Sequence, residues 1–213
     1  MQEIRRILSW LHRRTSGALS SIVLQPLKRS GVAVGSIHPL LSISDPVVGA
    51  ERLRGAFFAL EGDKRAVQIG RQLVRDIGGE SFTIKQEMKS LYHAGALMAS
   101  PNLTALLDIA VEILSECGLS RRRAREVLLP LVRSTIDNLS REDTAHALTG
   151  TFKRGDLQTI RKHIAAIESA GQKDALAAYL VLGRRSLKLA NNDKARTRDI
   201  ERLLSDAGHK HRP

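Results

Sequence analysis

Two residues in the middle of the chain, Lys89 and His93, have side-chain types and a spacing suited to acid–base chemistry. Side chains four residues apart lie on one face of a helix, about one turn from each other. A partly buried lysine has a lowered pKa, so it can donate a proton to a developing oxyanion or take one from a hydroxyl. His93 could orient a substrate or shuttle that proton. The alternative is a surface lysine next to an interior histidine whose hydrogen bonds are satisfied.

A third candidate, His38, follows the short β-branched run 32–34, which predicts a buried strand. We expect residues 36–44 to form the loop after this strand. Loops at the carboxyl ends of strands are where open α/β sheets bind ligands, so His38 could face a cofactor or a substrate. Ser16 and Gly17 would flank the same cofactor by the same argument. The alternative is that His38 is a loop residue whose imidazole caps a backbone carbonyl.

The remaining candidates, Asn102, Arg154 and Asp156, lie at expected helix ends and could bind a substrate. Arg154 could hold a carboxylate or a phosphate with two parallel hydrogen bonds. Asp156 caps the helix that follows it, after a tight turn in which Gly155 permits a positive φ. Asn102 follows Pro101 and could donate a hydrogen bond at a helix break. The alternative for the turn is simply a well-made helix start.

Periodicity and breaker residues divide the chain into an α/β part and a helical part. Up to about Gly79 we expect helices over 2–12, 19–29 and 64–77 and strands over 32–34 and 56–60, followed by one brief strand over 81–84. Beyond it we expect only helices, over 86–117 with a break at Pro101, 121–139, 142–148, 156–169, 174–190 and 191–207. The chain is therefore predicted to be mostly α, with an incomplete α/β start. The expected division is 1–79, 80–207 and a flexible tail over 208–213.

Composition narrows the classes of protein and partner. The 213 residues are 42% hydrophobic, which favours a folded core over disorder. No apolar run approaches 18 residues and no secretory signal is recognisable, so we expect a cytoplasmic chain without a membrane helix. Cys117 is the only cysteine, which excludes an internal disulfide, and no zinc-type cysteine–histidine spacing exists, so no metal site is expected.

The formal net charge of +12 favours anionic partners. Nucleic-acid binding is one such hypothesis, and the densest basic run, residues 121–125, motivates it. No aromatic-studded strand of the kind that binds RNA accompanies the charge. Charge that is scattered along a chain is usually a solvated surface, so we expect no nucleic-acid partner.

Several segments, in order and spacing, resemble one known family. They are Thr-Ser-Gly-Ala-Leu-Ser-Ser at 15–21, Gly-Ser-Ile-His-Pro-Leu at 35–40, Lys-Ser-Leu-Tyr-His-Ala at 89–94, Leu-Pro-Leu at 129–131 with Asn138, and Ala-Leu-Thr-Gly at 147–150 leading into 154–156 with Thr159, Ile160 and His163. This pattern resembles the bacterial Rossmann-like proteins with a C-terminal domain of unknown function 2520. Those proteins are similar to pyrroline-carboxylate reductases, ketopantoate reductases and 3-hydroxyacid dehydrogenases.

The resemblance implies a fold, a cofactor and a reaction. The fold would be a Rossmann-like N-terminal remnant followed by a helical substrate and dimerisation domain, in a homodimer. The reaction would be hydride transfer between NADP or NAD and a small carbonyl or hydroxy compound, with Lys89 and His93 in the place of a lysine–asparagine pair that faces the nicotinamide. The glycine-rich G-x-G-x-x-G turn is absent from the sequence, so we expect the chain to begin inside the nucleotide-binding half. The alternative function is a non-catalytic helical dimerisation or interaction module.

Overall fold

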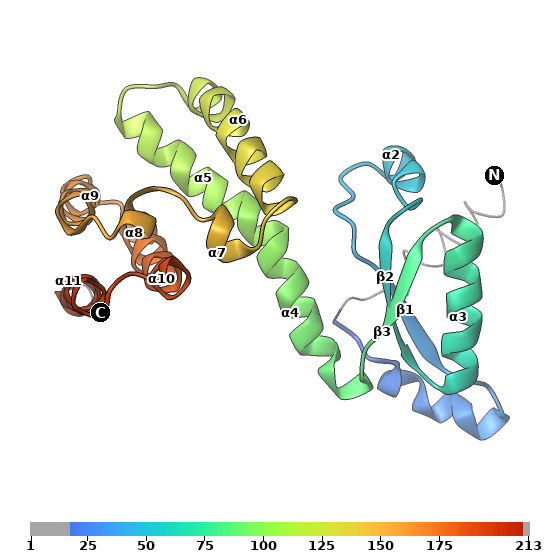
Figure 1. The fold of residues 1–213 in the computed structure, drawn as a ribbon. Coiled ribbons are helices and arrows are strands. Elements are labelled where there is room, and N and C mark those ends of the chain that lie inside the picture. Colours follow the sequence, from blue (N-terminus) through green and yellow to red (C-terminus); the bar gives the residue numbers. More distant parts are fainter. Residues whose placement is uncertain (1–17, 211–213) are drawn as a thin grey trace. The chain divides into compact units, whose positions relative to one another are not determined.

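The computed structural model describes residues 18–210 and divides after Asn102 into two compact units (Figure 1). Each unit has its own hydrophobic core. The predicted mostly helical chain with a short α/β start is confirmed. The expected helix over 2–12 and the candidates Ser16 and Gly17 lie outside the described residues.

The first unit is built on a three-stranded sheet in the order β1 (Gly35–Pro39), β2 (Phe57–Gly62) and β3 (Glu80–Thr83). Strand β1 is antiparallel to β2, whereas β2 and β3 are parallel and joined through helix α3 (Lys64–Ile77), as parallel neighbours require a crossover. Helix α3 packs along the sheet (Figure 1). The other elements of this unit are η1 (Ser21–Ser30), α2 (Pro46–Glu51), η2 (Gln86–Met88) and α4 (Lys89–Ala99).

Alternation along β2 gives the sheet one apolar face and one polar face. Phe58 and Leu60 are buried in a core cluster with Val67 and Val74 of α3. Because successive strand residues point to opposite faces, the intervening Ala59 and Glu61 face the other side of the sheet. The apolar face thus holds the sheet to α3, and the opposite face is free to carry polar side chains.

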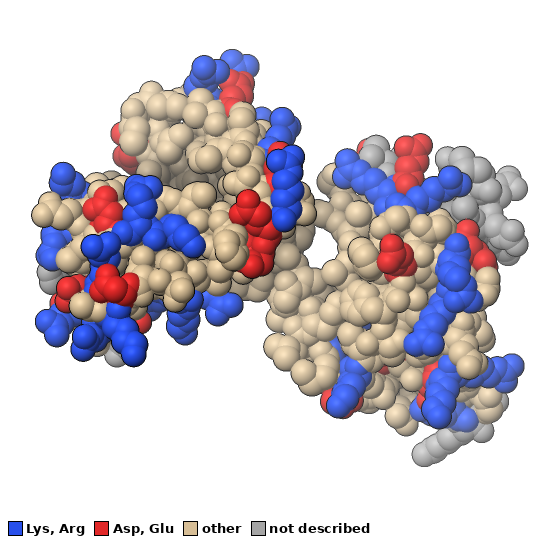
Figure 2. Space-filling model, in the orientation of Figure 1, with Lys and Arg blue, Asp and Glu red and all other residues tan. Residues whose placement is uncertain are grey.

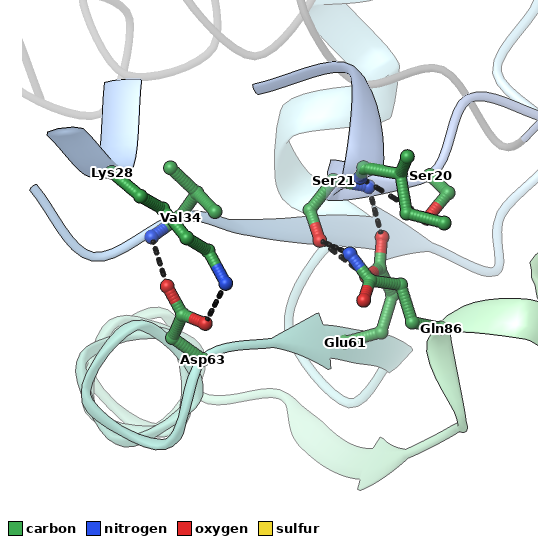
Figure 3. Close-up of polar contacts among 8 residues, drawn as sticks. Ser20, Ser21, Lys28, Val34, Glu61, Asp63 and Gln86 are labelled. Atoms are coloured by element: carbon green, nitrogen blue, oxygen red, sulfur yellow. Dashed lines mark hydrogen bonds and ion pairs between the residues drawn. The ribbon is translucent and has the colours of Figure 1, made fainter. Parts of the chain in front are cut away.

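Strand β1 begins later than the sequence predicts, and the expectation of a strand over 32–34 is wrong. Gly31, with φ 72°, ends η1 in the left-handed conformation, and Val32 is 51% exposed. The Asp63 carboxylate accepts a hydrogen bond from the Val34 amide at 3.0 Å (Figure 3). Strand pairing begins only at the next residue, Gly35. His38 therefore lies within a strand and not in the loop that the sequence suggested.

Within the described residues, the second unit is built from most of one helix, α5 (Pro101–Glu116), and the whole of six others. Helix α5 spans the division between the units, and the rest are α6 (Arg121–Leu139), α7 (Thr144–Ala147), α8 (Gly150–Arg154), α9 (Leu157–Ser169), α10 (Lys173–Ala190) and α11 (Lys194–Lys210). Its core is formed by α9, α10 and α11 around Ile160, Leu180 and Leu204. The expected break near Pro101 is present, because α4 ends at Ala99 and α5 begins at Pro101.

Helices α5 and α6 bury little of their own apolar surface within the second unit. Only Val111 on α5 and Ala124 on α6 are buried. By length and composition alone, the helical stretch Gln86–Glu116 would suffice to cross a membrane. Polar residues interrupt the apolar runs of this stretch, although few of them carry a charge.

The positive charge is distributed and partly paired. On the visible face, lysine and arginine side chains are interspersed with acidic ones (Figure 2). In the basic run at the start of α6, Arg121 pairs with Asp108 and Glu112, and both Arg122 and Arg123 pair with Glu126. The run is thus partly neutralised by carboxylates on α5 and α6.

Close packing between β1 and α3 gives a test of the fold at Gly35. A Cβ there would lie 2.9 Å from the Ala66 Cβ and 3.0 Å from the Glu61 carbonyl oxygen. We therefore expect Gly35→Ala to lower the free energy of unfolding by about 1–3 kcal/mol. Gly95→Ala is the matched control: Gly95 is inside α4 with open space around it, so alanine should stabilise by about 0.5–1 kcal/mol. Urea unfolding measures both, and a neutral Gly35→Ala would contradict the packing.

Candidate functional site

Lys89 is the first residue of α4 and one of the most completely buried side chains in the described chain. It is 1% exposed, and its Nζ donates a hydrogen bond to the Ser36 hydroxyl at 2.8 Å. Burial lowers the pKa of the Lys89 ammonium, whereas the negative charge of Glu61 acts in the opposite direction. Lys89 is therefore not a surface lysine, and its side chain is removed from bulk solvent.

His38 lies on β1 two residues after Ser36, on the same face of the strand. Its Nδ1 is 2.7 Å from the Tyr92 hydroxyl, and the two rings meet edge to face. Burial, with smaller contributions from Lys89 and His93, lowers the pKa of His38 to about 4. Burial raises the pKa of Tyr92 to about 12. Near neutral pH both partners are therefore uncharged, and the hydrogen bond joins two neutral groups.

His93 lies beside this pair, with its ring centroid 5.6 Å from that of His38. Its Nδ1 is buried and has no hydrogen-bond partner among residues 18–210. Buried polar atoms are nearly always paired, so an unpaired one calls for a water or a ligand group. Among the described residues, His93 thus differs at Nδ1 from the satisfied interior histidine of the alternative interpretation, and its role stays a prediction.

The start of α4 lies against β1, which brings these residues together. The side chains of Ser36 and His38 project from one face of the strand, and those of Lys89, Tyr92 and His93 project from one side of the helix. Two hydrogen bonds join the helix to the strand, one between Lys89 and Ser36 and one between Tyr92 and His38. The structure thus gathers Lys89, His93 and His38 into one cluster.

Tyr92 is the member of this cluster that the sequence reasoning missed. Its ring lies 5.8 Å from the Lys89 Nζ and 6.0 Å from the centroid of Phe82 on β3. The signal was available in part, because Tyr92 is three residues after Lys89 and therefore on the same side of the helix. Its partner was hidden, because His38 is 54 residues away along the chain.

The same polar face of the sheet carries a second buried group, Glu61, which the sequence reasoning also missed. Its carboxylate accepts hydrogen bonds from the Ser21 amide at 2.8 Å and the Ser21 hydroxyl at 2.6 Å. Gln86 Nε2 donates to the same hydroxyl at 2.7 Å. This chain of hydrogen bonds joins η1, β2 and η2, just before Lys89 (Figure 3).

The predicted substrate-binding residues belong to other elements than those that form the cluster. Asn102 is exposed near the start of α5, and its amide contacts the Met98 sulfur at 3.0 Å. Arg154 is exposed at the end of α8, in the second unit. The Asp156 carboxylate accepts hydrogen bonds from the Thr159 amide and hydroxyl, which caps α9 and lowers the pKa of Asp156. A role for these three residues in binding substrate stays a prediction.

The neutral state of His38 can be tested by following its imidazole signals during an NMR titration. We expect it to titrate near pH 4. Lys89→Met should raise this pKa, because one of its causes is the Lys89 charge, although burial will keep it below the ordinary value. Lys85→Met, at an exposed position, is the control and should leave it unchanged. An unchanged His38 in Lys89→Met would show that the two groups are not coupled.

The same pKa has a consequence for stability. The folded value of about 4 lies below the unfolded value of about 6.5, so between these limits the unfolded chain binds more protons. Stability contributed by neutral His38 is therefore fully present above pH 6.5 and is lost as the pH falls toward 4. His38→Gln should flatten this part of the stability profile in urea unfolding, and an equally steep profile would contradict the assignment.

Comparisons with known proteins place the chain in a family. A family model described as a domain of unknown function (DUF2520) matches residues 56–186, more than half of the chain. No curated protein matches this chain. A crystal structure of a protein from Thermotoga maritima is similar, with 27% identity and a TM-score of 0.59, over 93% of this chain and 68% of that one.

Two further solved structures share the fold. A protein of Bacteroides fragilis, named as a putative NADP oxidoreductase, has 18% identity and a TM-score of 0.63, over 82% of this chain and 63% of its own. The pyrroline carboxylate reductase of Plasmodium falciparum, with NADP bound, has 14% identity and a TM-score of 0.50, over 82% and 67%. This chain therefore spans about two thirds of the length of these structures. On the match of the family model, the protein belongs to the DUF2520 family, with an oxidoreductase-like, Rossmann-related fold.

Proposed function

We propose that this protein takes part in hydride transfer between a nicotinamide dinucleotide and a small carbonyl or hydroxy compound. The observation that carries the proposal is the buried Lys89 ammonium, set beside the neutral His38–Tyr92 pair and the unpartnered Nδ1 of His93. Perturbed titratable groups that gather around an unsatisfied polar atom are typical of functional sites. The names of the two oxidoreductase structures that share the fold support the same reaction class.

The cluster has the groups that carbonyl reduction and alcohol oxidation need. The dinucleotide, when bound, supplies or accepts the hydride. In reduction, negative charge develops on the substrate oxygen, and the Lys89 ammonium stabilises it. A proton must also reach that oxygen, and Lys89 and Tyr92 are the donors in the cluster. His93 Nδ1 would orient the substrate through a hydrogen bond.

The described residues fit the reactive end of such a cofactor better than its phosphates. Dinucleotide phosphates are usually held by a glycine-rich turn at a helix N-terminus. Residues 18–210 contain no G-x-G-x-x-G turn. His38, with Ser16 and Gly17 outside the described residues, is the proposed cofactor contact of this chain, and no phosphate contact is assigned.

NADP is the cofactor to test first, because two structural neighbours are named with it. NAD is the alternative, since the residue that distinguishes the two normally lies in the glycine-rich half. We also propose a cytoplasmic setting. The single cysteine, Cys117, is exposed and free, which is compatible with a reducing compartment.

Calorimetric titration with NADPH tests the proposal directly. We expect the folded chain to bind NADPH with a dissociation constant on the order of micromolar. Because the oxidised nicotinamide is cationic, the Lys89 charge should disfavour NADP⁺ relative to NADPH. Lys89→Met should then shift the preference toward NADP⁺ by roughly tenfold, about 1.4 kcal/mol, whereas Lys85→Met should not. A folded chain that binds neither form would contradict the proposal.

A second candidate function, a dimerisation module, is favoured by the uncovered surface of α5 and α6. Large apolar side chains on these helices are exposed, namely Leu103, Leu106, Val127, Leu131, Ile136 and Leu139. Exposed apolar surface of this extent usually marks an interface. A second copy of the chain is the proposed occupant, because symmetric homodimers are the commonest assemblies and pair the same surface on both subunits. This function and the first are compatible.

Light scattering over a concentration series tests the dimer. We expect a dimer for the unmodified chain and weakened association in Leu131→Glu, because a buried carboxylate without a partner is costly. Leu131 is 63% exposed, so the monomer should tolerate the change. Val181→Glu is the matched control, since Val181 on α10 is 62% exposed but lies outside the apolar surface of α5 and α6. A monomer at all concentrations would contradict the proposal.

A further inference from the structure

Glu61 and Lys89 are the two fully buried charged side chains on the polar face of the sheet. Each is 1% exposed. Among the described residues, they are also the only charged side chains in the buried set. Burying an isolated charge costs far more free energy than a hydrogen bond returns, so buried charges occur where an opposite charge lies near. The presence of both in one small unit therefore needs a common explanation.

Strand pairing brings the two groups close. Ser36 on β1 is directly opposite Glu61 on β2, and the Lys89 Nζ is bonded to the Ser36 hydroxyl. Side chains of directly opposite residues lie on the same face of an antiparallel pair, about 4.5–5.5 Å apart at Cβ. Lys89 thus reaches the sheet next to the Glu61 carboxylate. No direct ion pair joins them within the part of the chain that is described.

The hydrogen bonds of Glu61 hold η1 directly and reach η2, which leads into Lys89, through Ser21. Both carboxylate oxygens are held by Ser21, at the first residue of η1. Ser21 in turn accepts from Gln86, the first residue of η2, which leads directly into α4 (Figure 3). These bonds tie η1 to the carboxylate directly, and they tie η2 to it through the Ser21 hydroxyl. Glu61 is thus the point at which three elements meet.

We propose that Glu61 is a positioning residue, whose buried carboxylate keeps the Lys89 ammonium charged and holds η1 and η2 against the sheet. This inference rests on the proposed function for the role of Lys89, but the coupling between the two charges exists without any ligand. Glu61 does not contact the substrate in this scheme. It acts through Lys89.

The balance at Lys89 explains why a carboxylate is needed there. The groups that interact with Lys89 are Ser36 and His38 from β1, Glu61 from β2 and Tyr92 from α4 itself. Near neutral pH, Ser36, His38 and Tyr92 carry no charge, so Glu61 is the one group among these four whose negative charge favours the ammonium. Desolvation acts against it and lowers the pKa of Lys89. Removal of the Glu61 charge would leave no negative charge to oppose desolvation, and only the hydrogen bond to Ser36 and the Tyr92 ring would still favour the ammonium.

An NMR titration of the whole chain with isotope-labelled lysine tests the proposal. The Lys89 signal is identified by its loss in Lys89→Met. We expect Lys89 in Glu61→Gln to titrate at a lower pH than in the unmodified chain. Ser21→Ala is the control, because it removes one hydrogen bond to Glu61 and keeps the charge, so the Lys89 titration should change little. A purely structural role for Glu61 would not move the titration in this selective way.

A further variant keeps the test decisive. Glu61→Asp retains the charge but withdraws it by one methylene, so Lys89 should titrate between its values in the unmodified chain and in Glu61→Gln. If Glu61→Gln does not fold, this variant carries the test. If Lys89 titrates in either folded variant at the same pH as in the unmodified chain, the proposal is overturned. Failure of NADPH to bind would instead contradict the proposed function and leave this titration result intact.

Discussion

The burial of the Lys89 ammonium is the constraint on which the arrangement of the first unit depends. A charge that is removed from water must be compensated, and here the compensation comes from Ser36 directly and from Glu61 through space. Both partners sit on strands, so their positions are fixed by the backbone ladder. The charge is therefore held by residues of the hydrogen-bonded sheet, as its proposed role requires.

The sheet can hold the Lys89 charge because one of its faces is apolar and the other is polar. The apolar face, with Phe58 and Leu60, packs on α3 and supplies the hydrophobic stabilisation. The polar face carries Ser36, His38 and Glu61, and it is there that η1 and the start of α4 attach. A sheet of three short strands is near the lower limit for independent stability, and the packing of α3 on one face is what frees the other face for polar groups.

Family membership and site chemistry point in the same direction but carry different weight. The match of the DUF2520 model establishes the family, and the similarity to two oxidoreductase structures establishes the fold. A fold hosts many functions, so the proposed hydride transfer rests on the cluster of Lys89, His38, Tyr92 and His93 and not on the fold. That cluster belongs to a single unit, so its geometry does not depend on how the two units are arranged.

The sequence alone determined the order of most elements and the identity of three members of the cluster. Helices α3 and α6 have the predicted bounds, because strong local signals mark their ends. Gly78 terminates α3, and Ser120 caps the start of α6. The pair Lys89 and His93 was visible because helical neighbours are close in sequence. These are local features, and local physics decides them.

Tertiary structure decided what the local signals could not. The start of β1 depends on pairing with Gly62 and on the Asp63 carboxylate, both about 30 residues away, so the β-branched run at 32–34 was misleading. The role of Tyr92 depends on His38, which is 54 residues away in the sequence. The role of Glu61 depends on Ser21 and Lys89, which are 40 and 28 residues away. Burial, which shifts the pKa values of Lys89, His38 and Tyr92, is a property of the assembled unit. Residue types and helical spacing predicted acid–base chemistry at Lys89 and His93. The pairing of strands determined which side chains surround Lys89.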